Sequence, residues 1–249
     1  MVVGSPKKQG LIHVRKIYCL TIIAAALLSH MVSLPALATP GQASHQKASV
    51  AKGKVKNIDF LLKGWGHLNF LVCEDAILVD DPLREYTISC KAPDWLVSVY
   101  SKKRKLLAQV PLSKYDGGLA GRFTRMTAGG FQKEHAWQVI GTDKVQGQLC
   151  TVRKLVSDSN NPTYRSLWRH YAARDLKVKP QVLDFYYKNY GIPPMDGLCL
   201  KFVTGSTAAS TLIEALSIKT MPRAESIFAV PVGFKKSSVE DVMFEERDF

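Results

Sequence analysis

Four carboxylates close together in the first half of the chain are the first residues whose types and spacing could do chemistry. Glu74, Asp75, Asp80 and Asp81 fall within one short stretch, where they could bind calcium or act as an acid–base pair. They bracket a four-residue apolar run, and Pro82 follows. Carboxylates at both ends of a short strand, next to a proline, are typical of solvated turns. The spacing favours turns, and an enzyme of unrecognised type that uses these carboxylates or His67 is kept as a minor alternative.

The histidines, serines and cysteines do not match the spacing of a known zinc-peptidase or nucleophile motif. The histidines beyond residue 38 stand singly at His45, His67, His135 and His170, and none has the i, i+4 spacing of zinc peptidases. No serine lies in a Gly-x-Ser-x-Gly elbow, and no cysteine has the surroundings of a known thiol nucleophile. His67, which follows Trp65 and Gly66, is expected at a strand end, with a pocket mouth as the alternative. The sequence predicts no enzyme, no cofactor and no metal site.

The start of the chain has the order of features of a signal peptide. Lys7, Lys8, Arg15 and Lys16 precede an apolar run over residues 17–28, and small residues stand at Ala36 and Ala38. A basic region, an apolar region and a small-x-small site are the marks of export and cleavage. We expect cleavage after Ala38 and a periplasmic or secreted protein, the alternative being an uncleaved N-terminal helix.

Cysteine usage fits an exported chain. Four cysteines lie beyond residue 38, namely Cys73, Cys90, Cys150 and Cys199, and an even count in an exported protein suggests two disulfide bridges. Cys150 and Cys199 lie on either side, in the sequence, of a helix expected at residues 181–190, so a bridge between them would connect the helical segment to the sheet. The other expected bridge, Cys73 to Cys90, would close a meander of neighbouring strands, and the alternative is four buried thiols.

Charge and length bound the partners and the domain organisation. Without residues 1–38 the chain keeps 30 basic against 21 acidic residues, a net charge of +9. This charge is compatible with binding to an anionic membrane or envelope surface, and the basic run over residues 102–105 could contact such a surface. Because we expect export, we do not expect nucleic acid as a partner. We expect a flexible lead-in over residues 39–54, a single domain over residues 55–240 and an acidic tail over residues 241–249.

Short runs of β-prone residues, separated by turn residues, fill most of the domain. They predict strands at residues 58–62, 68–73, 76–79, 85–90, 95–100, 106–110, 137–140, 145–156, 198–204 and 211–219. Leu198, Leu200 and Phe202 alternate with more polar neighbours and indicate one core face. In the last strand, Leu212, Leu216 and Ile218 are expected to share a face, with Glu214 as a paired or rim carboxylate. The pattern predicts an antiparallel meander.

One helix and one glycine-rich segment interrupt the strands. Residues 181–190 carry apolar and aromatic residues at helical spacing, Pro180 suits the first turn, and Gly191 suits the stop. Residues 116–130 contain five glycines around Arg122 and Arg125. They lack the Gly-Lys-Ser/Thr ending of a phosphate-binding loop, and we expect a mobile loop or a lid.

The second half of the chain resembles a known family. Ile140-Gly141-Thr142, Tyr190-Gly191-Ile192-Pro193, Gly197-Leu198-Cys199-Leu200 and the closing stretch from Pro222 to Lys235 are similar, in order and spacing, to the LolA/LolB-like superfamily of exported lipoprotein carriers. The resemblance covers about the last 110 residues. It implies a strongly curved antiparallel sheet, or an incomplete barrel with one or a few helices against it, whose concave face in the carriers holds acyl chains.

These observations predict an exported, non-enzymatic binding protein that holds a lipid, an acyl chain or another amphiphile in the concave face of the sheet. Large aromatic side chains are the candidates to line that face: Trp65, Phe70, Trp95, Trp137, Phe202 and Phe228. The alternative is that these aromatics fill the core and that the protein is an envelope interaction or structural protein.

Overall fold

A single curved sheet forms the described part of the chain. The computed structural model describes residues 53–122, 136–156, 168–205 and 211–244, which all belong to one compact unit, Lys47–Phe249. The strands are β1 (Lys54–Leu62), β2 (Gly66–Cys73), β3 (Ala76–Asp81), β4 (Tyr86–Lys91), β5 (Leu96–Ser101), β6 (Leu106–Pro111), β7 (Trp137–Val145), β8 (Gln148–Leu155), β9 (Arg169–Ala173), β10 (Cys199–Val203), β11 (Thr211–Pro222) and β12 (Lys235–Lys236). The helices with assigned bounds are α3 (Pro180–Tyr190) and α4 (Val239–Met243), and residues 119–122 are also helical. The 3₁₀ turns are η1 (Leu112–Lys114) and η3 (Glu225–Phe228). The predicted mainly β fold is confirmed.

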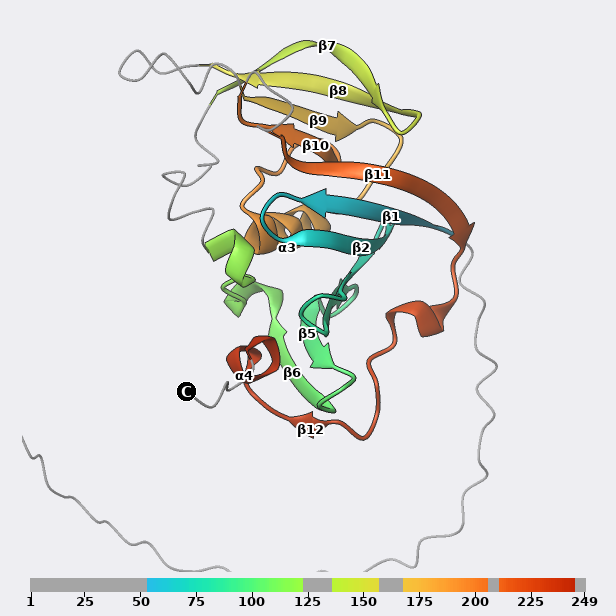
Figure 1. The fold of residues 1–249 in the computed structure, drawn as a ribbon. Helices are drawn as coiled ribbons and strands as arrows, with labels where there is room; N and C mark the ends of the chain where they lie inside the picture. The colour runs from blue at the N-terminus through green and yellow to red at the C-terminus, as the bar shows by residue number, and fades with distance from the viewer. Residues whose placement is uncertain (1–52, 123–135, 157–167, 206–210, 245–249) are drawn as a thin grey trace, which may run out of the picture. The chain divides into compact units, whose positions relative to one another are not determined.

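Two meanders join to make the sheet. Its strand order is β12-β6-β5-β4-β3-β2-β1-β11-β10-β9-β8-β7, and every neighbouring pair except β12 with β6 is antiparallel. Strands β1 to β6 form the first meander and β7 to β11 the second, and they meet where β1 pairs with β11 (Figure 1). The sheet does not close, because β7 and β12 are its two edges.

Alternating side chains give the sheet two different faces. Ile58, Phe60 and Leu62 of β1 belong to the main buried cluster, whereas Val55 belongs to a smaller cluster. Successive residues of a strand point to opposite faces, so these clusters lie on opposite sides of the sheet. We call the side of the main cluster, against which α3 packs, the inner face and the other side the outer face.

Helix α3 fills part of the inner face. It begins at Pro180 and ends at Gly191, which adopts a left-handed conformation with φ of 70°, so the helix predicted at residues 181–190 is confirmed. Its buried residues are Val182, Phe185, Tyr186, Asn189 and Tyr190. The ring centroids of Tyr186 and Tyr190 lie 5.9 and 5.5 Å from that of Phe70 on β2. Aromatic contacts at these distances hold the helix against the sheet.

The glycine-rich segment is partly described, and that part packs against the end of α3. A Cβ atom on Gly117 would lie 2.0 Å from the carbonyl oxygen of Lys188, and one on Gly121 would lie 2.1 Å from it. The Nζ of Lys188 donates to the carbonyls of Leu112 and Tyr115, at 2.7 and 2.9 Å. Glycine is required at residues 117 and 121 because the backbone of this segment lies directly against the backbone of α3. Residues 117–121 therefore pack tightly against the end of the helix. Gly129 and Gly130 lie outside the described residues.

The chain after β11 covers both faces and one edge of the sheet. Phe228 of η3 is buried in the outer cluster, and Val242 and Met243 of α4 join the inner cluster. Between them, β12 pairs with β6 (Figure 1). Arg104 donates to the carbonyls of Asp241, Val242 and Phe244 at the end of α4. The packed domain therefore extends past the predicted boundary at residue 240, and Arg104 is a helix cap rather than a free loop charge.

Bulges and one turn account for the local differences from the predicted strands. The register between β1 and β11 shifts by one residue between Asp59 and Phe60, and such a bulge changes which side chains face the core. As a result Ile213 and Ala215 are the fully buried residues of β11, and Leu216 is not. The predicted strand over residues 145–156 is instead the second half of a hairpin, which turns at Gln146 and Gly147, both with positive φ.

The predicted disulfides are not formed: Cys73, Cys90, Cys150 and Cys199 are free, buried thiols. Cys73 belongs to the outer cluster and Cys90 to the inner one, so their side chains lie on opposite faces. Cys150 pairs across to Ala173 and Cys199 to Ala172, so strand β9 lies between them. Two strand spacings are about 9–10 Å, beyond the Cα separation of about 7 Å that a disulfide can bridge.

Candidate functional site

A mostly apolar pocket lies at the tip of the β1–β2 hairpin. Its volume is about 640 Å³, and its lining residues are Leu61, Leu62, Lys63, Gly64, Trp65, Gly66, Leu83, Thr211 and Glu214. We call it the hairpin pocket. Small-molecule sites are commonly about 300–1,000 Å³, with apolar walls and a few polar groups, so the hairpin pocket has the size and composition of a binding site.

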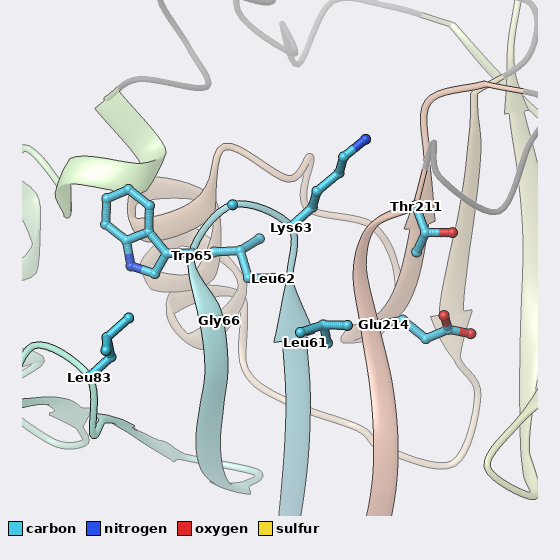
Figure 2. A pocket seen from close by; sticks show the side chains of 9 residues that line it. Leu61, Leu62, Lys63, Trp65, Gly66, Leu83, Thr211 and Glu214 are labelled. Carbon is cyan, nitrogen blue, oxygen red and sulfur yellow. The ribbon is translucent and has the colours of Figure 1, made fainter.

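The two sides of the hairpin contribute different walls. Figure 2 shows the side chains of Trp65 and Leu83 on one side of the hairpin and those of Leu61, Thr211 and Glu214 on the other. Leu61 and Glu214 are cross-strand partners in the β1–β11 ladder. Leu61 is 42% exposed and Leu83 is 70% exposed, which makes the pocket wall accessible to a ligand from solvent.

A buried carboxylate fixes Trp65 in the pocket wall. The side chain of Asp81, at the end of β3, is only 2% exposed. Its Oδ2 accepts from Trp65 Nε1 at 3.2 Å and from Arg84 Nη1 at 2.9 Å. The guanidinium carbon of Arg84 lies 3.8 Å from the centroid of the Trp65 ring. Arg84 Nη1 also donates to the carbonyl oxygen of Trp65 at 3.1 Å. The hairpin tip and the β3–β4 turn are thus held together by two hydrogen bonds, Trp65 to Asp81 and Arg84 to the Trp65 carbonyl, and by a cation–π contact.

Polar groups border the pocket on the outer face. Glu214 accepts from Lys201 Nζ at 2.7 Å, which confirms the prediction that Glu214 is a paired carboxylate. His67 Nδ1 lies 3.2 Å from Asp59 Oδ1, and both side chains are largely exposed. His67 is not among the residues that line the hairpin pocket. The structure places it on strand β2, one residue after the pocket wall ends at Gly66.

The predicted aromatic residues do not gather in one place. Trp65 lines the hairpin pocket. Phe70 and Phe202 are fully buried core residues, Trp95 and Trp137 are partly buried against the same inner cluster, and Phe228 is buried in the outer cluster. Trp137 and Phe202 have ring centroids 6.1 Å apart. Side chains therefore occupy the inner face at these positions, where a ligand was expected.

The predicted carboxylates also separate. Asp75 pairs with Arg223, Asp80 accepts from the hydroxyl of Thr87 at 2.7 Å, and Asp81 pairs with Arg84. Asp80 and Asp81 are consecutive residues of one strand, so they point to opposite faces. Among the residues that the structure describes, no group of three or more His, Cys, Asp and Glu could hold a metal ion.

The buried thiols have the surroundings of structural cysteines. Burial raises the pKa of Cys73 and Cys150 to about 11 and that of Cys90 to about 12. A thiol reacts as its thiolate, and reactive cysteines have lowered pKa values. These thiols are therefore poor nucleophiles at neutral pH.

His170, on strand β9, is a fully buried titratable group. Neither ring nitrogen has a hydrogen-bond partner among the described residues. Its ring centroid lies 6.0 Å from those of Trp137 and Phe202. Burial lowers the pKa of His170 to about 3, and the charge of Arg153 acts in the same direction. The imidazole is therefore neutral at physiological pH and belongs to the core.

Sequence reasoning missed Leu61 and Leu83 as pocket residues. Leu61 stands on the polar face of β1, where Asn57 and Asp59 precede it, and Leu83 stands inside a turn after Pro82. An apolar residue on a polar face, together with one in a solvated turn, is the signal that could have marked this site.

The structure also has no helix, in the ranges it describes, with the length and apolar character to span a membrane.

Comparisons with known proteins give distant similarities in fold. No family model matches the sequence, and neither does any curated protein. Among solved structures, an uncharacterized conserved protein from Thermus thermophilus is 9% identical, with a TM-score of 0.33, over 76% of this chain and 91% of that one. A LolA superfamily protein from Nitrosomonas europaea is 12% identical, with a TM-score of 0.25, over 73% and 91%.

The MucA/MucB complex of Pseudomonas aeruginosa gives a third match, 10% identical with a TM-score of 0.32, over 76% of this chain and 59% of that one. A LolA superfamily protein is thus among the solved structures to which this chain is similar. Likeness at this level describes the fold and carries no argument about a ligand.

Proposed function

We propose that this protein is an exported, non-enzymatic binding protein and that it holds the alkyl chain of an amphiphile in the hairpin pocket. The observation that carries the proposal is the pocket itself, about 640 Å³ with mostly apolar walls at the accessible end of the β1–β2 hairpin. Export rests on the signal-like N-terminal sequence, and the absence of catalysis rests on the scattered histidines and carboxylates and the poorly nucleophilic thiols.

The ligand position that we propose differs from the concave face expected from the sequence. The inner face was expected to hold the ligand, but Phe60, Phe70, Phe202 and α3 occupy it with buried side chains. The hairpin pocket lies at the rim of this packed face, where Leu62 and Trp65 border it. Binding there buries apolar groups of ligand and protein without opening the core, and burial of apolar surface provides the free energy.

Chain length provides the first test. Octyl, decyl and dodecyl maltoside are titrated calorimetrically, below their micelle concentrations, into the full-length chain. Each buried methylene contributes about 0.8 kcal/mol, so the association constant should rise by up to about fourfold per methylene until the pocket is filled.

Matched leucine variants assign the binding to the pocket. Leu61→Asn places an amide in the wall and should weaken binding of dodecyl maltoside by at least about tenfold, since a polar group without a partner opposes an alkyl chain. Leu216→Asn is the control: Leu216 is 37% exposed on neighbouring β11 and is not a lining residue. Equal weakening by both variants, or no saturable binding to the unaltered chain, would refute the proposal.

The filled inner face favours a second candidate function, an envelope interaction or structural protein whose surface meets another macromolecule. Native mass spectrometry of the protein purified from its own cell envelope separates the two. A co-purifying amphiphile supports the binding protein, and a co-purifying protein subunit without an amphiphile supports the second candidate.

A further inference from the structure

A second pocket lies at the opposite end of β1 from the hairpin pocket. Its volume is about 580 Å³, a size that suits a small molecule. The start of β1, the β2–β3 turn, the segment before α3 and the residue after β11 border it. Eight of its eleven lining residues are charged, and the full lining is Gly53, Lys54, Lys56, Cys73, Glu74, Asp75, Asp175, Leu176, Lys177, Lys179 and Arg223. We call it the lysine pocket. This composition suits a charged ligand rather than an alkyl chain.

Contacts between the bordering segments fix the walls of the lysine pocket. The backbone N–H of Lys179 donates to the carbonyl oxygen of Glu74 at 2.7 Å, and that of Arg223 donates to the carbonyl oxygen of Gly53 at 3.1 Å. The guanidinium of Arg223, whose side chain is only 15% exposed, pairs with the carboxylate of Asp75. The pocket is therefore formed before a ligand arrives, which reduces the ordering that binding requires.

The four lysines of this pocket have no carboxylate partner in the described part of the chain. The ion pairs among described residues include none of Lys54, Lys56, Lys177 and Lys179. Lys56 Nζ donates instead to the neutral hydroxyl of Thr220 at 2.9 Å. The ammonium groups are therefore available to an incoming anion.

The lysine pocket keeps a positive charge after its ion pairs are counted. Its lining has five basic and three acidic residues, a net charge of +2. Arg223 pairs with Asp75 inside the lining and also meets Glu225, outside it, at 3.4 Å, and the net charge is +1 when Glu225 is included. Positive charges around a concave site, without paired counter-charges, attract anions.

We propose that the lysine pocket binds a phosphomonoester, with the lysines of β1 and of the segment before α3 as its donors. Such a group has three acceptor oxygens and between one and two negative charges at neutral pH, so it can pair with lysines from two walls at once. Lysine binds phosphate as a point charge. Soluble sugar or glycerol phosphates carry this group, and so does the headgroup of phosphatidic acid. The inference is independent of the alkyl-chain site.

The test titrates glycerol 3-phosphate, and glycerol as its uncharged counterpart, into the isotope-labelled full-length chain and follows backbone amide chemical shifts. Glycerol 3-phosphate should shift the amides of residues 53–56, 73–75 and 175–179 saturably, and glycerol should not. Added sodium chloride should weaken the binding, because salt screens exposed charges.

Matched double variants assign the binding to the pocket. Lys177→Gln with Lys179→Gln should raise the dissociation constant for glycerol 3-phosphate at least about fourfold, because one exposed ion pair contributes roughly twofold to fivefold. Lys235→Gln with Lys236→Gln is the control. It removes the same charge from two exposed positions on β12, which do not line the pocket, and should leave the dissociation constant unchanged.

Vesicle sedimentation distinguishes the two sources of the phosphomonoester. If the chain sediments with phosphatidylcholine vesicles only when they contain phosphatidic acid, and the Lys177 and Lys179 double variant does so less, the ligand is a lipid headgroup. Binding of glycerol 3-phosphate without vesicle binding assigns a soluble phosphomonoester. The proposal is overturned if neither probe binds, or if both double variants weaken binding equally, since net charge alone would then explain it.

Discussion

The guanidinium of Arg84 stacks on the indole of Trp65, with 3.8 Å between the guanidinium carbon and the ring centroid. Both side chains also donate to the same oxygen of Asp81. This arrangement joins the β1–β2 hairpin to the β3–β4 turn, and these are the two elements that supply the apolar walls of the hairpin pocket.

The first prediction concerns the ion pair between Arg84 and the buried carboxylate of Asp81. Arg84→Met leaves the carboxylate of Asp81 buried without its cation and should lower the free energy of unfolding by about 1–3 kcal/mol. Lys103→Met is the matched control, because its pair with Glu85 is largely exposed and should cost less than about 1 kcal/mol. Urea denaturation measures both, and equal losses would contradict the assigned role of Asp81.

The second prediction concerns the close contact between residues 117–121 and the end of α3. Gly121→Ala places a Cβ 2.1 Å from the carbonyl oxygen of Lys188, so the backbone must shift, and we expect a destabilisation of about 1–3 kcal/mol. Gly53→Ala is the control, because the nearest atom to an added Cβ at Gly53 is Arg223 Cδ at 3.6 Å. This variant should leave the midpoint of urea denaturation almost unchanged. A stability of Gly121→Ala equal to that of Gly53→Ala would show that residues 117–121 do not pack as described.

The third prediction concerns acid. The pKa of His170 is about 3 in the folded protein because the ring is buried, against an ordinary value of 6.5. The unfolded chain therefore takes up a proton as the pH falls below about 6.5, whereas the folded chain does so only near pH 3. The stability that the neutral ring provides is complete above about pH 6.5 and is lost as the pH falls toward 3, by at most about 5 kcal/mol.

His170→Leu tests this acid dependence. Leucine does not titrate, so the stability of the variant should fall less between pH 7 and pH 4 than that of the unaltered chain, whatever the two stabilities at pH 7. Urea midpoints measured across this range decide the matter. Parallel pH profiles for the two proteins would mean that His170 is solvated or hydrogen-bonded in the folded state.

The fourth prediction concerns the cysteines. Alkylation of the unfolded, unreduced protein followed by peptide mapping should find Cys73, Cys90, Cys150 and Cys199 all modified, and alkylation of the native protein should modify them slowly, since they are buried thiols with raised pKa values. A peptide that links Cys150 to Cys199 would show that β8, β9 and β10 pack differently from the structure described.

Local patterns predicted most of the fold. The proline at residue 180 and the glycine at residue 191 delimit α3 as expected. The predicted strands correspond to those of both meanders except β9 (Arg169–Ala173), which lies in a stretch where the sequence does not distinguish a strand from a helix. The pairing of β1 with β11 joins residues far apart in sequence, and no local pattern encodes it. On β11, Leu212 and Ile218 both pack against the inner cluster, as expected, whereas Leu216 does not, because the register shift between β1 and β11 places Ile213 and Ala215 in the core.

The site was less predictable than the fold. Trp65 was a candidate because its type suits an apolar pocket, but five other aromatic residues suited it equally by type, and burial alone distinguishes them. Leu83 becomes a pocket residue only because the β3–β4 turn packs beside the β1–β2 hairpin. The role of Arg104 depends on a helix more than 130 residues later in the chain, which no reading of the basic run over residues 102–105 provides.

Photo-crosslinking locates the ligand most directly. An alkyl maltoside with a diazirine at the end of its chain is bound to the full-length protein, irradiated and mapped by peptide mass spectrometry, with excess dodecyl maltoside as competitor. The account predicts competitor-sensitive labelling in residues 61–66 and at Leu83, which line the hairpin pocket. Labelling centred on Phe70 or Phe202 of the inner face, or labelling that the competitor does not reduce, would contradict it.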